Sequence, residues 1–423
     1  MEVRRLIPII TKSVLRTSYR KVSSSSKKCA AIPTIQEIRT QLQQTLGASS
    51  AWIKSEEYRE KLAASLPQTQ SDLTPRRMQD SYYEAIVPLS DPVIREKYKG
   101  LYDNVRLGQL LENLDTFAVH ISYLHNNPYS SKTGESPLSI VTAMVDEIKI
   151  HNHCLESQAD ILLKGHVTWT GKSSMEIKMW LTQLAKPIID ATFVMVARDP
   201  LNRSAIVYPL LMEDPKDKAL FQEGEKHKIE RLEEAKYSLL KYPPKEEERQ
   251  VVHDLFLQTL DTKTMSFRGR QLPEDCVWME DTKLKNSIIC FPEKRNIHNK
   301  IFGGFLMRTG FELAWANACI FSKTRPHVTA VDDILFRCPV QIGSLLLISS
   351  QVCFSQGKDF HIRAHAEVMD PHTGVSTTCN TFNFSFTCDN ENLPTVMPRT
   401  YGESMLYLDG RRHYNTLKGI SGV

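Results

Sequence analysis

The chain has 423 residues, of which 41% are hydrophobic and 24% charged, and its length predicts two or three domains of ordinary soluble globular composition. The net charge of +4 is small and comes partly from the amino terminus, so it gives no indication of nucleic-acid binding. No apolar run approaches the roughly 18 residues that a membrane-spanning helix needs.

The amino terminus has the composition of a targeting segment. Residues 4 to 28 hold eight Lys or Arg and no acid, with four serines together at Ser23 to Ser26. Apolar residues from Leu6 to Leu15 can gather on one helical face, which is typical of a mitochondrial transit peptide. We therefore interpret residues 1–31 as a transit peptide to the mitochondrial matrix; the alternative is a disordered basic tail.

The next elements follow in a clear order. Residues 32–82 read as a polar, helix-permissive arm, and residues 83–211 as a first domain. In this domain a helix over 109–118 has apolar residues at helical spacing, and a polar loop follows it. The predicted strands are 139–150, 158–170, 175–182 and 187–198, with Gly171-Lys172 as a hairpin turn.

The second half of the chain repeats the first. Val145-Asp146-Glu147-Ile148 returns 186 residues later as Val331-Asp332-Asp333-Ile334, and Gly171-Lys172 returns at the same offset as Gly357-Lys358. Gly108 corresponds to Gly304 at an offset of 196, because the loop after the first helix is ten residues longer in the first copy. We interpret the chain as a duplication of a unit of roughly 120 residues, with the second copy at 269–393.

The segments outside the two copies carry no expected chemistry. Residues 212–268 alternate in charge, which predicts an exposed linker helix stopped by Pro243-Pro244. Residues 394–423 read as a tail spaced by Pro and Gly that wraps the surface.

The most distinctive stretch begins at Asn296. A polar loop leads into Gly303-Gly304 and then into an apolar run that predicts a buried helix. Glycines at a helix start let a ligand approach the backbone, and the first amides of a helix are free donors for a carbonyl or phosphate oxygen. The alternative is a glycine-rich turn before a core helix.

Each copy is therefore a long buried helix followed by antiparallel strands, an α+β unit in which a sheet curls around the helix. These units resemble the hotdog fold, and the chain resembles the double-hotdog acyl-coenzyme A thioesterases of mitochondrial type. The resemblance rests on residues 296–304, 331–343 and 171–176. Two departures are that Ser344 stands where such enzymes commonly carry an acid, and that the first copy has Leu107-Gly108 instead of two glycines.

The resemblance also implies a division of catalytic residues. In that family an Asn lies eight residues before the second glycine and an acid seven residues after it. The second copy has Asn296 but Phe311, and the first has Gly100 but Asp115. The implied arrangement is one composite site of Asp115 and Asn296 per chain, and an inactive interface with Gly100 and Phe311.

The implied reaction is hydrolysis of fatty acyl-coenzyme A to fatty acid and coenzyme A. The Gly304 amide would stabilise the oxyanion, and Asn296 would bind the carbonyl or position water. Asp115 would act as general base or as nucleophile, unless it is a solvated helix residue. Glu312 is the alternative acid, one residue after the expected position 311, which places its side chain about 100° further around the helix axis. A hotdog enoyl-coenzyme A hydratase and a non-catalytic acyl-coenzyme A sensor or scaffold are the alternatives.

The remaining expectations concern binding and assembly. Substrate-binding candidates are Gly303, His298, Asn299, Lys300 and Arg325. No cofactor is implied, and trimers of double units are the family's common arrangement.

No metal site is expected. The nine cysteines form no CxxC pair and read as reduced thiols. His151, His153 and Cys154 lack a second cluster at ligand spacing, and His361 and His365 share a strand face without further ligands.

Overall fold

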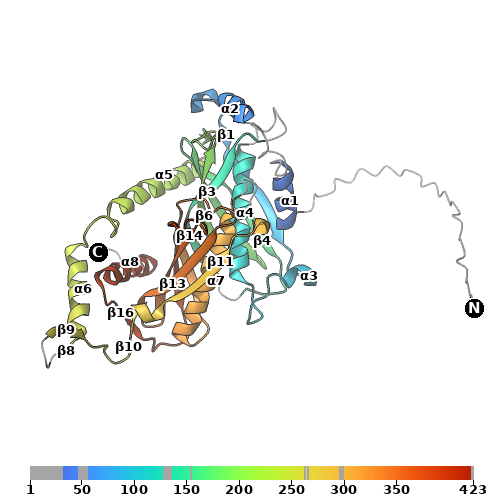
Figure 1. The fold of residues 1–423 in the computed structure, drawn as a ribbon. Helices are drawn as coiled ribbons and strands as arrows, with labels where there is room; N and C mark the ends of the chain where they lie inside the picture. Colours follow the sequence, from blue (N-terminus) through green and yellow to red (C-terminus); the bar gives the residue numbers. More distant parts are fainter. Residues whose placement is uncertain are drawn as a thin grey trace, which may run out of the picture. The chain divides into compact units, whose positions relative to one another are not determined.

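The computed structural model describes residues 32–45, 56–126, 136–152, 155–261, 263, 266–294 and 300–420, so the expected transit peptide lies outside the described residues. The fold is α+β (Figure 1). The helices are α1 (Ile35–Thr45), α2 (Glu56–Ala64), α3 (Pro92–Arg95), α4 (Leu107–His125), α5 (Pro215–Lys236), α6 (Glu246–Gln258), α7 (Gly303–Ser322) and α8 (Tyr401–Leu417).

The strands of the main sheet are β2 (Tyr83–Val87), β3 (Ser139–Ile150), β4 (Ile161–Thr170), β5 (Ser174–Gln183), β6 (Lys186–Arg198), β11 (Leu284–Ile289), β12 (His327–Phe336), β13 (Leu345–Gln356), β14 (Asp359–Met369) and β15 (Ser376–Thr387). Short pairs lie outside it: β1 (Arg76–Arg77) with β7 (Leu210–Leu211), β8 (Leu260–Asp261) with β9 (Ser266–Arg270), and β10 (Cys276–Trp278) with β16 (Thr395–Met397).

Within the described ranges, ten strands form one antiparallel sheet in the order β11-β13-β14-β15-β12-β3-β6-β5-β4-β2. The two halves of this order are mirror images. In each half the edge strand is the one that precedes the long helix in the chain, and the second, third and fourth strands after that helix follow it inward. The first strand after the helix lies at the centre of the sheet. The central strands β12 and β3 pair so that Val331 lies opposite Ile148 and Ile334 opposite Val145. The repeated motif therefore pairs with itself about a local twofold axis.

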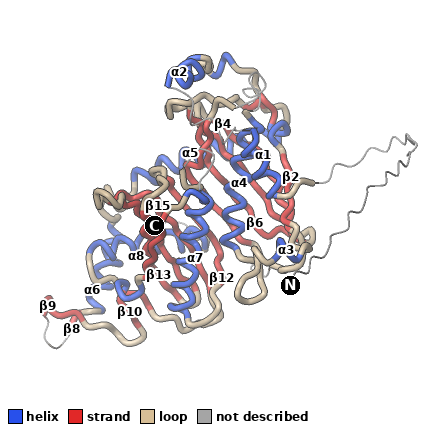
Figure 2. The backbone as a smooth tube through the Cα atoms, turned by 45° about the vertical axis from the view of Figure 1, so that its right-hand side comes forward, coloured by secondary structure: helices blue, strands red, loops and turns tan. Residues whose placement is uncertain are grey.

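The long helices α4 and α7 pack side by side against one face of this sheet (Figure 2). Leu110, Leu114, Phe117 and Ile121 of α4 are all 0% exposed and recur every three or four residues, which is the spacing of a helix buried along one stripe. The predicted helix 109–118 is the middle of α4, and burial continues to His125. The start of each helix therefore lies beside the side of the other helix.

Helix α8 covers the opposite face of the sheet. Phe360 of β14 contacts Phe321 of α7, whereas the next residue, His361, stacks on His413 of α8 at 4.7 Å. The surface tail expected over 394–423 thus contains a helix at residues 401–417 that was not predicted. The signal for this helix was a capping box, in which Thr400 accepts from the Glu403 amide and Glu403 accepts from the Thr400 amide.

The segments around the repeats also pack closely. Helix α5 ends at Lys236, before Pro243, and lies so near β4 that a Cβ on Gly224 would come within 2.5 Å of Trp169. The linker is thus not a fully solvated helix, and α6 follows the prolines. In the arm, α1 buries Ile35 and Ile38 and packs on α4. No helix among the described residues is long and apolar enough to cross a membrane.

Candidate active site

The structure brings Asp115 of the first copy to the start of α7 in the second copy. The Gly304 amide donates to Asp115 Oδ2 at 2.7 Å, and the Thr142 hydroxyl on β3 donates to Asp115 Oδ1 at 2.5 Å. Asp115 is only 1% exposed. It is a buried carboxylate held across the interface of the repeats, and not a solvated helix residue.

Two glycines make this approach possible. A Cβ on Gly304 would lie 2.9 Å from the backbone oxygen of Glu112, so the α7 start lies directly against the α4 backbone. A Cβ on Gly303 would lie 3.2 Å from Asp115 Oδ2 and 3.3 Å from the Phe336 ring. Because both positions lack side chains, the Gly304 amide, at the positive end of the α7 dipole, reaches the carboxylate.

Burial shifts the acidity of Asp115. Desolvation raises its pKa from 3.8 to about 6, while the hydrogen bonds from Thr142 and Gly304 oppose that rise by stabilising the anion. Glu112, one turn earlier, is flanked by Arg39 of α1 at 3.3 Å and Arg308 of α7 at 3.1 Å. Asp115 can thus change protonation state near neutral pH, which suits a group that takes up a proton.

The other predicted site residues are distributed differently. Asn296, His298 and Asn299 lie outside the described residues. Lys300 donates to Gln341 at 2.5 Å, close before the Gly303 turn. Arg325 does not lie with Asp115: it lines a cavity at the opposite interface, next to Gly100.

That opposite interface differs chemically from the Asp115 interface. Phe311, at the position equivalent to Asp115, is 5% exposed and packs against Phe384. Glu312 Oε1 accepts a hydrogen bond from Arg106 Nε at 2.8 Å and forms an ion pair with Arg106 Nη2 at 2.6 Å. The rival acid is therefore engaged by a cation at the other interface and points away from Asp115.

Sequence reasoning missed three residues near Asp115. Thr142 had no signal beyond its place on a predicted strand, and Arg39 lies in a segment to which no chemistry was assigned. Glu112 lies on the predicted helix 109–118 without any assigned role, and its side chain is only 14% exposed. Only the packing of α1, α4 and β3 brings these groups together.

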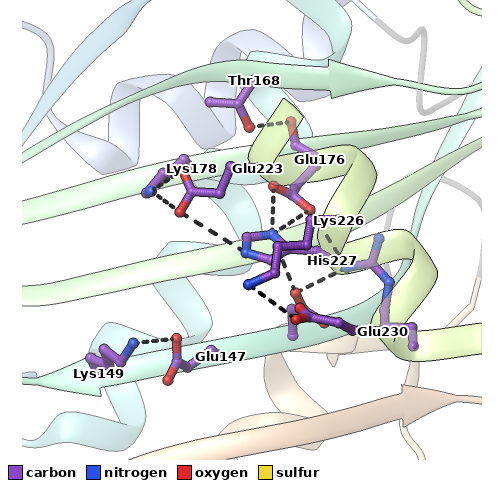
Figure 3. Close-up of polar contacts among 11 residues, drawn as sticks. Glu147, Lys149, Thr168, Glu176, Lys178, Glu223, Lys226, His227 and Glu230 are labelled. Carbon is purple, nitrogen blue, oxygen red and sulfur yellow. Dashed lines mark hydrogen bonds and ion pairs between the residues drawn. The ribbon is translucent and has the colours of Figure 1, made fainter. Parts of the chain in front are cut away.

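A second polar cluster lies between the sheet and α5 (Figure 3). His227 contacts Glu176 at 3.2 Å, and Arg231 lies 2.9 Å from Asp146 and 3.5 Å from Glu176. The hydrogen bond that the Glu176 carboxylate accepts from His227 raises the pKa of His227. Atoms of Asp146, Glu176 and His227 that could hold a metal ion lie within 4.8 Å of one another, but Arg231 already supplies the positive charge. We interpret the cluster as the electrostatic attachment of α5.

The histidines considered for a metal have other partners. His151 pairs with Asp190 at 3.0 Å, and His153 and Cys154 lie outside the described residues. His361 contacts the Ser385 hydroxyl at 3.1 Å, and His365 pairs with Glu367.

Comparison with known proteins establishes the family. The chain is 50% identical over 394 residues to the human acyl-coenzyme A thioesterase 9, mitochondrial, covering 91% of this chain and 89% of the relative. It is 46% identical to the mouse acyl-coenzyme A thioesterase 10, mitochondrial (95% and 94% covered), and 32% identical to the hop acyl-coenzyme A thioesterase 2, chloroplastic (76% and 77%). No family model matches the chain.

The chain therefore belongs to the acyl-coenzyme A thioesterases, a family of thioester hydrolases. Within that family its relatives of 46 to 50% identity are the mitochondrial thioesterases 9 and 10, and it is a mitochondrial enzyme of this type. Among solved structures, an acyl-CoA hydrolase from Staphylococcus aureus is 19% identical, with a TM-score of 0.33 over 34% of this chain and 91% of that chain.

Proposed function

We propose that this enzyme hydrolyses fatty acyl-coenzyme A to fatty acid and coenzyme A at one composite site per chain. The observation that carries the proposal is the buried Asp115 carboxylate against the first amides of α7, with a pKa of about 6. The opposite interface supports a single site, because Phe311 replaces the acid and Arg106 engages Glu312.

The proposed chemistry begins with a change of partner. The Gly304 amide donates to Asp115 in this structure, so it serves the thioester oxygen only after the substrate carbonyl displaces the carboxylate. This displacement frees Asp115 Oδ2 to accept a proton from water. The water oxygen bonds to the carbonyl carbon, negative charge develops on the oxygen facing Gly304, and the C–S bond then breaks to release coenzyme A, which takes up the proton.

The nucleophilic alternative uses the same residues. Asp115 Oδ2 attacks the carbonyl carbon, the thiolate leaves, and water hydrolyses the resulting anhydride. Asn296 is proposed as a second donor to the thioester oxygen or to the water in either route. Hydrolysis in ¹⁸O-water under single turnover identifies the anhydride route when water attacks the Asp115 carbonyl carbon, because ¹⁸O then enters Asp115 and an Asp115 oxygen leaves with the fatty acid.

We further propose that each half is a hotdog unit, that the chains assemble as trimers of these double units, and that the enzyme works in the matrix. The mirrored strand order and the long helices α4 and α7 support the first. The basic, acid-poor residues 4 to 28 support matrix import. Sedimentation of the protein tests the trimeric assembly. The location of a tagged full chain in cells tests import into the matrix.

The test of the activity is release of free thiol from acyl-coenzyme A by the full chain and by three variants. Asp115→Ala and Asn296→Ala are expected to lose about 100-fold or more, as removal of a base or an oxyanion donor does. Glu312→Ala is the matched control and should lose little. Full activity in Asp115→Ala contradicts the composite site, and binding without turnover by the parent indicates a sensor. Addition of water to an enoyl thioester instead indicates a hydratase.

A further inference from the structure

The interface without the catalytic acid contains a cavity of about 510 Å³. The local twofold axis relates this interface to the one that contains Asp115. Four groups around Asp115 have counterparts among its lining residues: Gly108 for Gly304, Phe311 for Asp115, Val328 for Thr142, and Ile150 for Phe336. We call this space the second cavity.

The second cavity is unsuited to hydrolysis. The Phe311 side chain cannot accept a proton, and its ring packs against Phe384 with centroids 5.6 Å apart. The nearby carboxylate of Glu312 is held by Arg106, and the side chains of Glu312 and Arg308 lie against Gly108. Glu96 and His327 also line the cavity, but the position equivalent to Asp115, beside the start of the long helix, is held by Phe311.

The lining nevertheless has the two characters of an acyl thioester site. Its apolar wall includes Leu107, Ile150, Phe311 and Trp315, which suits an acyl group. The basic side chains Lys99, Arg106 and Arg325 lie in the same lining with the acids Glu96 and Glu312. Arg106 is paired with Glu312, whereas no acid among the described residues forms an ion pair with Arg325. The start of α4 also faces it, and the first turn of α4 carries no acid. Positive charge beside an apolar wall fits a molecule with an acyl chain and phosphates.

Aromatic side chains position the cation at its edge. The Arg325 guanidinium stacks over Tyr102 at 4.9 Å, and Tyr102 meets Trp315 edge to face at 6.3 Å. This contact fixes the planar Arg325 guanidinium beside the apolar wall.

We propose that the second cavity is a non-hydrolysing binding site for acyl-coenzyme A, distinct from the composite catalytic site. The acyl group lies along Phe311 and Trp315, and the phosphates face Arg325. The choice of ligand rests on the proposed function. One chain then binds two acyl-coenzyme A molecules and hydrolyses one of them.

The test is calorimetric titration of the full chain with the thioether dodecyl-coenzyme A, which has no thioester to hydrolyse. Two equivalents per chain are expected. Arg325→Glu should weaken one of them by about 10-fold or more, because it removes a charge-assisted contact. Trp315→Ala should weaken the same equivalent through the acyl group. Lys358→Glu is the matched control, since it makes the same charge change on an exposed hairpin and should leave both intact.

Three outcomes overturn the proposal: one equivalent in the parent, two equivalents that both survive Arg325→Glu, or dodecanoate filling the second cavity as tightly as the thioether. Thiol release by the parent is measured in parallel. If the parent binds two equivalents, loses one in Arg325→Glu, yet hydrolyses nothing, the proposed function fails while the second cavity stands.

Discussion

Replacing Asp115 by Asn should abolish hydrolysis and at the same time stabilise the protein at alkaline pH. The carboxamide is nearly isosteric: its oxygen can accept from the Gly304 amide, and its NH₂ can donate to Thr142 Oγ1. The variant therefore keeps both contacts and removes a buried charge. It loses the group that we propose accepts the proton or attacks the thioester, so thiol release should fall about 100-fold or more.

The magnitude of the stability effect follows from linkage. The folded pKa of about 6 exceeds the ordinary value of 3.8 by about 2 units, which corresponds to about 3 kcal/mol. Folding raises the pKa of Asp115. Below pH 3.8 the carboxyl is therefore protonated in both the folded and the unfolded state, and its burial as a charge takes nothing from the free energy of unfolding. The penalty grows as pH rises from 3.8 to the folded pKa of about 6 and is fully present above it. Asp115→Asn should thus gain up to about 3 kcal/mol at pH 8 and about 1 kcal/mol at pH 4.5.

The assay compares thermal unfolding midpoints of parent and variant at pH 8 and pH 4.5, beside thiol release. Other buried acids such as Asp332, with a pKa raised by burial to about 8, are present in both proteins and cancel in the difference. A variant that is inactive and less stable at pH 8 than at pH 4.5, relative to the parent, contradicts the burial argument. In the parent, kcat/KM should rise as pH passes about 6.

Three further predictions test the surroundings. Gly304→Ala should lower thiol release at least about 10-fold, because its Cβ meets the α4 backbone at 2.9 Å, whereas Gly108→Ala meets only side chains and should be nearly neutral. Glu312→Gln should lower the unfolding midpoint only slightly, since its pair with Arg106 is more than a third exposed, and activity loss above threefold would count against its structural role. Arg231→Met should lower the free energy of unfolding, measured in urea, by about 3 kcal/mol, because it removes one of the cations beside the buried Glu176 carboxylate. The double variant that also carries Glu176→Gln should recover part of this loss.

Much of the secondary structure was predictable because its signals are local. The expected strand 139–150 is β3, and the turns at Gly171 and Gly357 join β4 to β5 and β13 to β14. Alternating burial and turn residues need no knowledge of distant contacts. Helix α8 was missed because the capping box at Thr400 was outweighed by the Pro and Gly spacing around it.

The sequence by itself indicated a duplication, placed Asp115 and Phe311 at equivalent positions of the two copies, and placed Asp115 and the glycine pair in different halves of the chain. Those facts depend on order and offset along the chain. The tertiary structure alone decided that Asp115 is buried, that Thr142 bonds to it, and that the arm residue Arg39 reaches the adjoining Glu112. These contacts join residues 27 and 73 positions apart. Burial and pKa depend on everything packed around a group, and no periodicity in the chain encodes them.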